Sequence, residues 1–459
     1  MDRFIGRKRE LEELERRLSS DDFEFIVVYG RRRVGKTTLI EKAIDGKACV
    51  FLQATANDKY NLSELSLQIG VLFPDLAGMI NFNSYQDVFR FFSIKAKEES
   101  LILVIDEISY IAEGDNSFLQ ILQSFVDHEF RKTKLKLVLS GSYVHFMESN
   151  VMGPQSPLFG RRSVAIKLES FAIAESVSFF PSWSSDEKVA AHILTGGIPS
   201  YLNLIASFDN LKEALKKLFF NSMGLLYNEQ RVLLNNSVRA VSNYEMILST
   251  IASGTNKVTL IADKTGLDKA NVSSLLHSLN LMGIVDEVVS IAPKVRKIGW
   301  RIADGYYAFY YRFVYPSRNM IERNLSDIVV ERTMQNLNVF IGRRIETDFR
   351  NYVLGISGFL PERYGFAEFG NPITHQNEEI DLVAIDNEGR YLLGECKWKS
   401  EKVGVDVLED LLRKSLLLNP SDFQLYICSK SGFTDKAIEF AKHDKRYHLI
   451  TGKELMESV

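Results

Sequence analysis

Residues Phe23–Thr38 read FEFIVVYGRRRVGKTT, an apolar run followed at once by a loop bounded by glycines. The loop has the spacing GxxxxGK[ST], in which glycines let backbone N–H groups approach a phosphate closely. Lys36 would reach the β- and γ-phosphates, and the Thr37 hydroxyl would ligate Mg²⁺. An accidental glycine turn is the alternative, but a strand pattern before the loop and a helix pattern after it favour a nucleotide site. The expected loop residues are Gly30, Arg31, Arg32, Arg33, Val34, Gly35, Lys36, Thr37 and Thr38.

Short apolar runs alternate with helical patterns on both sides of this loop, which is typical of a parallel sheet covered on both faces. The expected class is therefore α/β. The candidate strands are residues 23–29, 48–54, 101–106, 135–141 and 163–168.

The run LILVIDEIS, residues 101–109, supplies the second half of a nucleotide site. Asp106 ends the apolar strand and can hold the Mg²⁺ shell, while Glu107 can orient an attacking water. The alternative is an acidic pair that only caps a helix. With the phosphate loop upstream, ATP hydrolysis is the preferred interpretation.

Bulk properties narrow the remaining choices. The chain has 459 residues, which predicts two to four domains, and a net charge of −3, which does not indicate nucleic-acid or membrane binding as a whole. Cys49, Cys396 and Cys428 are far apart and form no CxxC pair, which argues against a zinc knuckle or a disulfide framework. The apolar runs are far shorter than the ~20 residues of a membrane span. We expect a cytoplasmic protein.

Residues 238–303 show three helical patterns followed by two alternating strands around a Pro-Lys turn, which is typical of a winged helix. The third helix, with Asp268 as N-cap, would enter a DNA major groove. The alternative is a spacer or protein-binding module, because Lys269 is the only basic residue of that helix. The wing residues expected on DNA phosphates are Lys294, Arg296, Lys297 and Arg301. Residues 304–334 then begin with an aromatic cluster, DGYYAFYYRFVYP, which we expect to pack as core rather than to stack on bases.

The stretch EIDLVAIDNEGRYLLGECKWKS, Glu379–Ser400, predicts a hairpin with a turn at Asn387–Gly389. Counting back from the turn places Asp381 opposite Glu395, and strand alternation puts Lys397 on the same face as Glu395. Opposed residues have Cβ atoms about 4.5–5.5 Å apart, so two carboxylates there repel unless a cation lies between them. Mg²⁺ or Mn²⁺ would satisfy both, and Lys397 could stabilise charge on a phosphate.

The hairpin residues resemble the PD-(D/E)xK nuclease pattern, and this resemblance implies that Glu346, on a helix before the hairpin, completes a catalytic set with Asp381, Glu395 and Lys397. Lys414 is a further candidate, with an ordinary surface lysine as its alternative, and His375 is more simply a solvated loop residue. The alternative for the hairpin as a whole is a partly exposed cross-strand ion pair.

Several motifs of residues 1–205 resemble the archaeal-type ATPases related to the STAND and AAA+ lineages: RFIGRKREL, YGRRRVGKT, LVIDEI, LVLSGS, SPLFGRR and GGIPSYL. The resemblance implies that Gly6 and Arg7 lie near the base. It also implies that the GGIP segment, which ends at Pro199, approaches the adenine from a helical lid.

The same resemblance implies a γ-phosphate sensor at Ser140 or Ser142 and an arginine finger at Arg161 or Arg162. Helix capping and a plain surface position are the respective alternatives. Residues 335–459 resemble the DUF234-type domain with the PD-(D/E)xK nuclease pattern, although Ile380 replaces the proline of that pattern.

The sequence therefore predicts an ATPase core (1–170), a helical lid and connector (171–237), a winged helix (238–303), an aromatic connector (304–334) and a nuclease-like domain (335–459). We expect an ATP-regulated, metal-dependent nuclease that acts on DNA. The alternative is a STAND-like regulatory ATPase whose nuclease-like domain only binds, and a small-molecule kinase is disfavoured by the extra domains. An arginine finger acting in trans would require a homo-oligomer.

Overall fold

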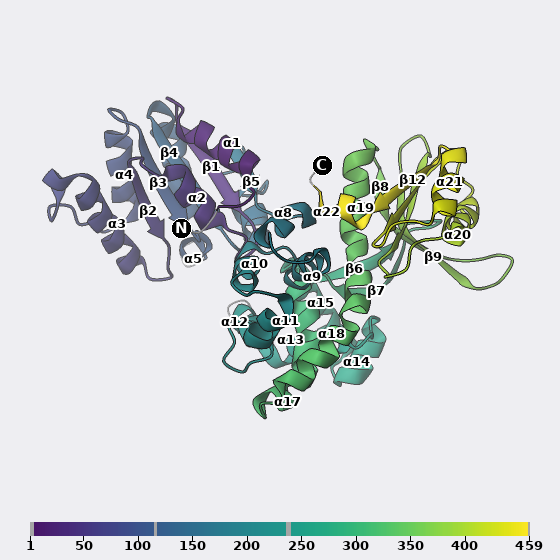
Figure 1. Cartoon of the computed structure of the whole chain (residues 1–459). Coiled ribbons are helices and arrows are strands. Elements are labelled where there is room, and N and C mark those ends of the chain that lie inside the picture. The colour runs from purple at the N-terminus through teal and green to yellow at the C-terminus, as the bar shows by residue number, and fades with distance from the viewer. Residues whose placement is uncertain (1–3, 114–116, 236–239, 458–459) are drawn as a thin grey trace. The chain divides into compact units, whose positions relative to one another are not determined.

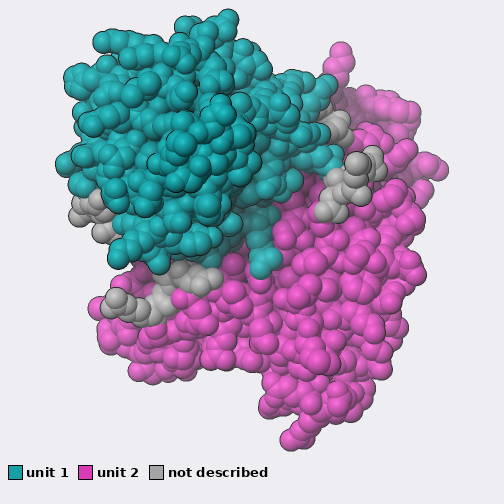
Figure 2. Space-filling view, turned by 90° about the vertical axis from the view of Figure 1, so that its left-hand side faces the viewer, with its two compact units in different colours: residues 1–170 teal, residues 171–459 magenta. Residues whose placement is uncertain are grey.

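The computed structural model describes residues 4–113, 117–235 and 240–457, and the chain divides into two compact units, residues 1–170 and 171–459 (Figures 1 and 2). No helix within these described ranges is long and apolar enough to cross a membrane.

Unit 1 is built on a five-stranded parallel sheet with the strand order β2-β3-β4-β1-β5. Alternate residues of each strand face opposite sides of the sheet. Phe25 and Val27 accordingly belong to one apolar cluster, and Ile26 and Val28 to another. The elements are α1 (Lys8–Leu18), β1 (Glu24–Tyr29), α2 (Lys36–Ile44), β2 (Cys49–Gln53), α3 (Asp58–Leu72), α4 (Tyr85–Lys95), β3 (Leu101–Asp106), α5 (Ser109–Ala112), α6 (Phe118–His128), β4 (Leu135–Gly141), α7 (Val144–Phe146) and β5 (Val164–Lys167). The prediction of a parallel α/β sheet is confirmed.

Unit 2 begins with helices, and residues Val241–Ile302 form three helices followed by an antiparallel hairpin. Asp268 caps the third helix by accepting a hydrogen bond from the backbone N–H of Asn271 at 2.9 Å. The elements are α8 (Ile173–Ser176), α9 (Ser185–Thr195), α10 (Pro199–Ala206), α11 (Leu211–Ala214), α12 (Glu229–Asn235), α13 (Val241–Ala252), α14 (Val258–Thr265), α15 (Lys269–Leu281), β6 (Val285–Ser290), β7 (Arg296–Ile302), α16 (Gly305–Phe309), η6 (Tyr310–Val314), α17 (Arg318–Glu322) and α18 (Ser326–Gly342).

The aromatic cluster that follows this hairpin is core. Tyr306, Tyr307, Tyr310 and Tyr311 are at most 2% exposed. They belong to the large apolar cluster that includes the helices on either side of them in the sequence. The packing interpretation of this cluster is confirmed.

The rest of unit 2 forms a mixed sheet with the order β12-β11-β10-β9-β8-β6-β7, so the hairpin β6–β7 extends the C-terminal sheet (Figure 1). The junction is a single parallel pair, Ser290 with Phe366. The elements are α19 (Ile345–Ser357), β8 (Arg363–Gly370), β9 (Asn377–Ile385), β10 (Tyr391–Lys397), α20 (Val405–Leu416), β11 (Phe423–Ser429), α21 (Asp435–His443), β12 (Tyr447–Thr451) and α22 (Gly452–Met456).

The basic residues of the β6–β7 hairpin are engaged within unit 2. We expected them to meet DNA phosphates, yet three of the four pair with acidic side chains. The pairs are Arg296–Glu368 at 3.3 Å, Lys297–Glu287 at 2.6 Å and Arg301–Asp286 at 3.9 Å. Docking of the hairpin beside β8 brings the Glu368 backbone and side chain to Arg296, whereas the other two pairs join β6 to β7 within the hairpin.

Two glycines allow α9 and α16 to touch backbone to backbone. A Cβ at Gly305 would lie 2.3 Å from the Ile193 carbonyl oxygen and 2.5 Å from the Gly196 nitrogen. No side chain fits such a space without moving one helix, so this contact fixes the separation of the two elements.

We predict that Gly305→Ala lowers the free energy of unfolding of unit 2 by about 1–3 kcal/mol, because the added methyl overpacks this contact. All three tryptophans (Trp183, Trp300 and Trp398) lie in unit 2, so tryptophan fluorescence during urea unfolding reports on that unit. Gly355→Ala on α19 is the matched control. A Cβ there meets no atom of the described residues within 4 Å, so this variant should gain about 0.5–1 kcal/mol. Equal stability of the two variants would contradict the packing argument.

Candidate functional site

The loop between β1 and α2 places Lys36 at the first position of α2, where its side chain folds back over the loop. Lys36 is 5% exposed, and its Nζ donates to the carbonyl oxygens of Gly30 at 3.1 Å and Arg31 at 3.2 Å and to Ser142 Oγ at 2.7 Å. Burial lowers the pKa of Lys36, while the nearby Glu107 and Asp106 carboxylates oppose that shift. The amine is thus held among oxygen atoms, where it can meet a phosphate.

Asp106 and Glu107 lie at the end of β3 beside this lysine. Thr37 Oγ1 donates to Asp106 Oδ2 at 2.8 Å, which brings together the two side chains expected around Mg²⁺. The Ser142 hydroxyl and its backbone N–H both donate to the Glu107 carboxylate, the latter at 3.0 Å. Ser142 therefore connects Lys36 to Glu107. The Ser140 hydroxyl is buried and has no hydrogen-bond partner among the described residues.

The backbone is strained at three places around this site. Arg7, Arg33 and Glu107 have φ angles of 59°, 67° and 56°, in the left-handed region that costs a residue with a side chain about 1–2 kcal/mol. Arg7 is buried, and its Nη2 donates to the carbonyl oxygens of Val34, at 3.3 Å, and of Glu169. Arg7 thus connects the phosphate loop to the segment that follows β5.

Three of the remaining arginines predicted for the nucleotide site make contacts with residues other than Lys36 and Thr37, and Pro199 belongs to unit 2. Arg32 donates to the Tyr110 hydroxyl at 3.2 Å, and Arg161 forms a bidentate pair with Asp127, with both N–O distances at 2.8 Å. Arg162 donates to the Met152 carbonyl oxygen at 3.4 Å. Pro199 opens α10 in unit 2, so its contact with a nucleotide stays a prediction, as does an arginine finger.

A second group of polar side chains lies on the sheet of unit 2. Strands β9 and β10 pair antiparallel with Tyr391 opposite Ile385 and Gly394 opposite Leu382. The turn contains Gly389 at φ 76°. The next position along this register sets Glu395 beside Asp381.

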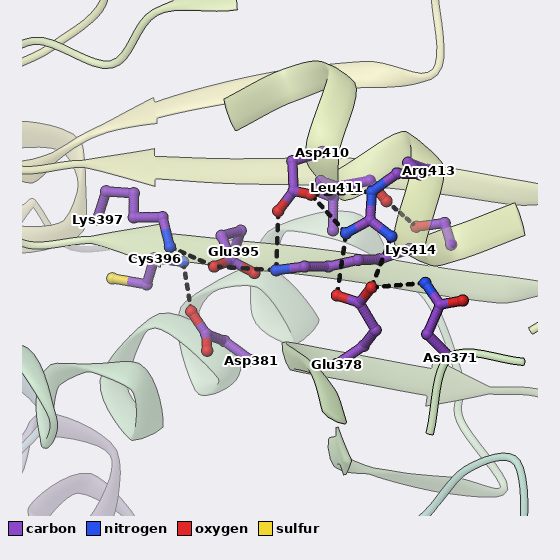
Figure 3. Close-up of polar contacts among 11 residues, drawn as sticks. Asn371, Glu378, Asp381, Glu395, Cys396, Lys397, Asp410, Leu411, Arg413 and Lys414 are labelled. Atoms are coloured by element: carbon purple, nitrogen blue, oxygen red, sulfur yellow. Dashed lines mark hydrogen bonds and ion pairs between the residues drawn. The ribbon is translucent and has the colours of Figure 1, made fainter. Parts of the chain in front are cut away.

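Glu395 is 6% exposed and lies between two lysines (Figure 3). Its Oε1 accepts a hydrogen bond from Lys397 Nζ and lies 4.0 Å from Lys414 Nζ. Asp381 Oδ2 accepts from the backbone N–H of Cys396 at 2.8 Å. Glu395 Oε2 is buried and has no hydrogen-bond partner among the described residues.

The carboxylates of this group repel one another. Burial raises the pKa of Glu395 and of Asp381, and the Asp381 charge adds to the shift at Glu395. Burial and then Asp381 raise the pKa of Glu346 to about 8, so this side chain carries a proton at neutral pH in the metal-free protein. Burial disfavours the charge on Lys397, but the Glu395 carboxylate outweighs it and raises the pKa of Lys397.

Two basic residues join this group, and neither belongs to the predicted catalytic set. Arg350, one turn after Glu346 on α19, is buried and donates to the Asp381 carbonyl oxygen at 2.7 Å. Lys414 on α20 is 13% exposed and bonds Asp410 at 2.9 Å as well as facing Glu395. For Arg350 the signal was its i+4 spacing from Glu346, which places both on one helix face.

Lys414 belongs to a longer polar network. Arg413 forms a bidentate pair with Glu378 at 2.6 and 2.9 Å and also bonds Asp410 at 2.7 Å, while Asn371 donates to Glu378 at 2.8 Å (Figure 3). These contacts fix α20 against β9 and so hold Lys414 over Glu395.

The residues of this group suit a hard divalent cation. Within the described ranges no three His, Cys, Asp or Glu side chains are gathered as a complete metal site. Mg²⁺, however, is usually held by one or two carboxylates, with water and substrate phosphate completing its shell. Asp381 and the unpartnered Oε2 of Glu395 provide such a pair.

Two family models match separate parts of the chain. Residues 4–205 match the family ATPase_2, described as an ATPase domain predominantly from Archaea, and residues 310–407 match DUF234, described as archaeal and bacterial proteins of unknown function. Residues 4–205 are therefore similar to archaeal ATPase domains, and residues 310–407 are similar to DUF234 domains. The ATPase match includes the phosphate loop and β3 described above, and the DUF234 match includes Glu346, Asp381, Glu395 and Lys397.

Two proteins of one archaeal organism are similar in sequence to this chain. An uncharacterized protein of Methanocaldococcus jannaschii, MJECL04, is 28% identical over 430 residues, which cover 92% of this chain and 94% of the relative. An uncharacterized ATP-binding protein of the same organism, MJ0423, is 52% identical over 44 residues, 10% of this chain and 75% of that protein. The Walker-type ATPase PABY2304 of Pyrococcus abyssi is similar in structure, with a TM-score of 0.50 and 22% identity over 67% of this chain and 96% of that one. This likeness supports the parallel-sheet P-loop fold.

We predict that Glu346→Gln raises the melting temperature in metal-free buffer at neutral or higher pH by several degrees. The reason is that burial, together with repulsion by Asp381, forces the Glu346 carboxyl to take up a proton on folding, and the amide has no such cost. Tryptophan fluorescence during heating measures the change. Glu362→Gln, at an exposed position, is the matched control and should leave the melting temperature unchanged. A lower melting temperature for Glu346→Gln would contradict the repulsion argument.

Proposed function

We propose that this protein is an ATPase that regulates a metal-dependent nuclease acting on DNA. The ATPase part rests on the site in unit 1 and on the family match of residues 4–205. The nuclease part rests above all on the buried, unpartnered Oε2 of Glu395, which lies in a group of carboxylates and lysines.

In unit 1, Lys36 and the backbone of the phosphate loop would bind the phosphates of ATP, and Thr37 and Asp106 would hold the accompanying Mg²⁺. The Thr37–Asp106 hydrogen bond of 2.8 Å shows that both oxygens already face one another. Mg²⁺ supplies neutralisation of phosphate charge. Glu107, fixed by the two hydrogen bonds from Ser142, would orient a water molecule for attack on the terminal phosphate.

We predict that Glu107→Gln lowers the rate of ATP hydrolysis about 10²-fold or more and leaves ATP binding within a few fold of the wild type. Phosphate release and the binding of a fluorescent ATP analogue measure the two effects separately. Lys36→Ala should weaken binding itself. Glu113→Gln, an exposed acid seven residues beyond Asp106, is the control and should hydrolyse ATP normally. An unchanged rate of ATP hydrolysis in Glu107→Gln would show that Glu107 does not orient the attacking water.

In unit 2, Asp381 and Glu395 would hold a divalent cation, which supplies Lewis-acid polarisation of a phosphate oxygen. The Lys397 ammonium lies beside Glu395 and would offset the charge that develops on a phosphodiester. Lys414 approaches the same carboxylate from α20 and can contact a neighbouring phosphate. Glu346 holds a proton at its carboxyl group, which would become available when a cation or substrate enters.

The part of unit 2 that would contact DNA is the segment of three helices and a hairpin, residues 241–302. Helices α13–α15 with the β6–β7 hairpin have the element order of a winged helix, and we propose that α15 rather than the hairpin faces DNA. The ion pairs of Arg296, Lys297 and Arg301 support this choice, because each cation is already neutralised in part.

We predict that the wild type cleaves DNA in Mg²⁺ or Mn²⁺ and that Asp381→Ala lowers the rate at least about 10²-fold. Single-stranded, duplex and branched DNA would be tested with and without ATP. Glu388→Ala, an exposed residue in the turn of the same hairpin, is the matched control and should cleave within about twofold of the wild type. Absence of cleavage in the wild type, or equal cleavage by Asp381→Ala, would refute the nuclease proposal.

The second candidate function is a regulatory ATPase whose DUF234 domain binds a partner without cleavage. The docked hairpin favours it, since a wing paired with β8 presents few free cations to DNA. In this case ATP hydrolysis persists, and the carboxylates of unit 2 matter only for stability.

A further inference from the structure

Helix α19 makes a polar contact on the side away from the carboxylates. Asp348 is two residues after Glu346, so the two side chains project about 200° apart around the helix. Asp348 Oδ1 lies 2.9 Å from His192 Nε2 on α9, and His192 Nδ1 lies 2.8 Å from Ser176 Oγ. The His192 side chain is only 6% exposed. Helix α19, which carries Glu346, is therefore held by α9 on the helix face opposite Glu346.

His192 lies close to Gly197, which in turn contacts Phe171 at the beginning of unit 2. A Cβ at Gly197, which has φ 69°, would lie 2.2 Å from the Phe171 carbonyl oxygen and 3.2 Å from His192 Cε1. The backbone N–H of Gly197 donates to the His192 carbonyl oxygen at 3.2 Å, and the N–H of Phe171 donates to the Gly197 carbonyl oxygen at 2.8 Å. Gly197 therefore connects Phe171 to His192 through backbone hydrogen bonds.

The residues just before Phe171 are fixed in the same way within unit 1. Arg7, which also bonds the phosphate loop at Val34, donates to the Glu169 carbonyl oxygen. A Cβ at Gly30, the first loop residue, would lie 2.3 Å from the Leu168 carbonyl oxygen. Ser170 alone separates the segment held by the phosphate loop from the segment held by Gly197.

We propose that His192 is a positioning residue for Glu346 and that it conveys the position of the phosphate loop to α19. Nucleotide binding at the loop would shift residues 168–169, and Phe171, Gly197 and His192 would carry that shift to Asp348. The proposal rests on the function proposed above and names how its ATPase part acts on its metal site. The His192–Asp348 contact joins α9 to α19 and is partly buried, so it can hold the orientation of α19.

Hydrogen–deuterium exchange of the full-length protein tests this proposal without relying on cleavage. Addition of a non-hydrolysable ATP analogue with Mg²⁺ should slow exchange in α2 and change the exchange rates of α19, residues 345–357, about fivefold or more in the wild type. In His192→Ala the α2 response should remain and the α19 response should disappear.

Two further variants separate positioning from folding. His192→Gln can still donate to Asp348 and should recover most of the α19 response. His448→Ala removes another partly buried histidine of unit 2, bonded to Gln424 on β11 at 2.9 Å, and should respond as the wild type does. A wild type that protects α2 without any change in α19, or a His192→Ala variant with the full response, would overturn the proposal.

Cleavage assays distinguish failure of this proposal from failure of the nuclease. If the α19 response requires His192 and no cleavage occurs, the connection is supported and the nuclease is refuted. If metal-dependent cleavage occurs and His192→Ala retains the full effect of ATP on its rate, the nuclease is supported and the connection is refuted.

Discussion

The antiparallel register of β9 and β10 is the constraint on which the unit 2 site depends. With Tyr391 opposite Ile385, Asp381 and Glu395 come to neighbouring positions, and alternation places Lys397 on the same face as Glu395. A slip of one residue would send these side chains to the opposite face, which lies in the apolar core. Carboxylates gathered in this way repel one another and lower the stability of the fold. A divalent cation bound between them would relieve that repulsion.

The parts that follow from local chemistry were predictable from the sequence. Gly389 at a left-handed position sets the turn, and the turn sets the register of the hairpin. The strands of unit 1 match their apolar runs because a parallel strand that is buried on both faces carries apolar side chains along its whole length. Lys36 and Thr37 follow from the same argument, since the phosphate-loop spacing determines where their side chains start.

Tertiary packing decided the rest. Lys414 reaches Glu395 only because Arg413 pairs with Glu378 and fixes α20 against β9, a contact between residues 35 positions apart. The pairing of the β6–β7 hairpin with β8 was not predictable, since no local pattern in either segment indicates it. The role of His192 was not predictable from the sequence either, because its partner Asp348 lies 156 residues away.

The central claim is that the carboxylates of β9 and β10 form a divalent-cation site. Anomalous diffraction from crystals grown with Mn²⁺ and an ATP analogue tests it most directly. We expect one peak between Asp381 and Glu395, within about 2–2.5 Å of their oxygens, and a second peak near Thr37 and Asp106. A peak at the phosphate loop with none between Asp381 and Glu395 would contradict the claim and leave the regulatory ATPase as the better account.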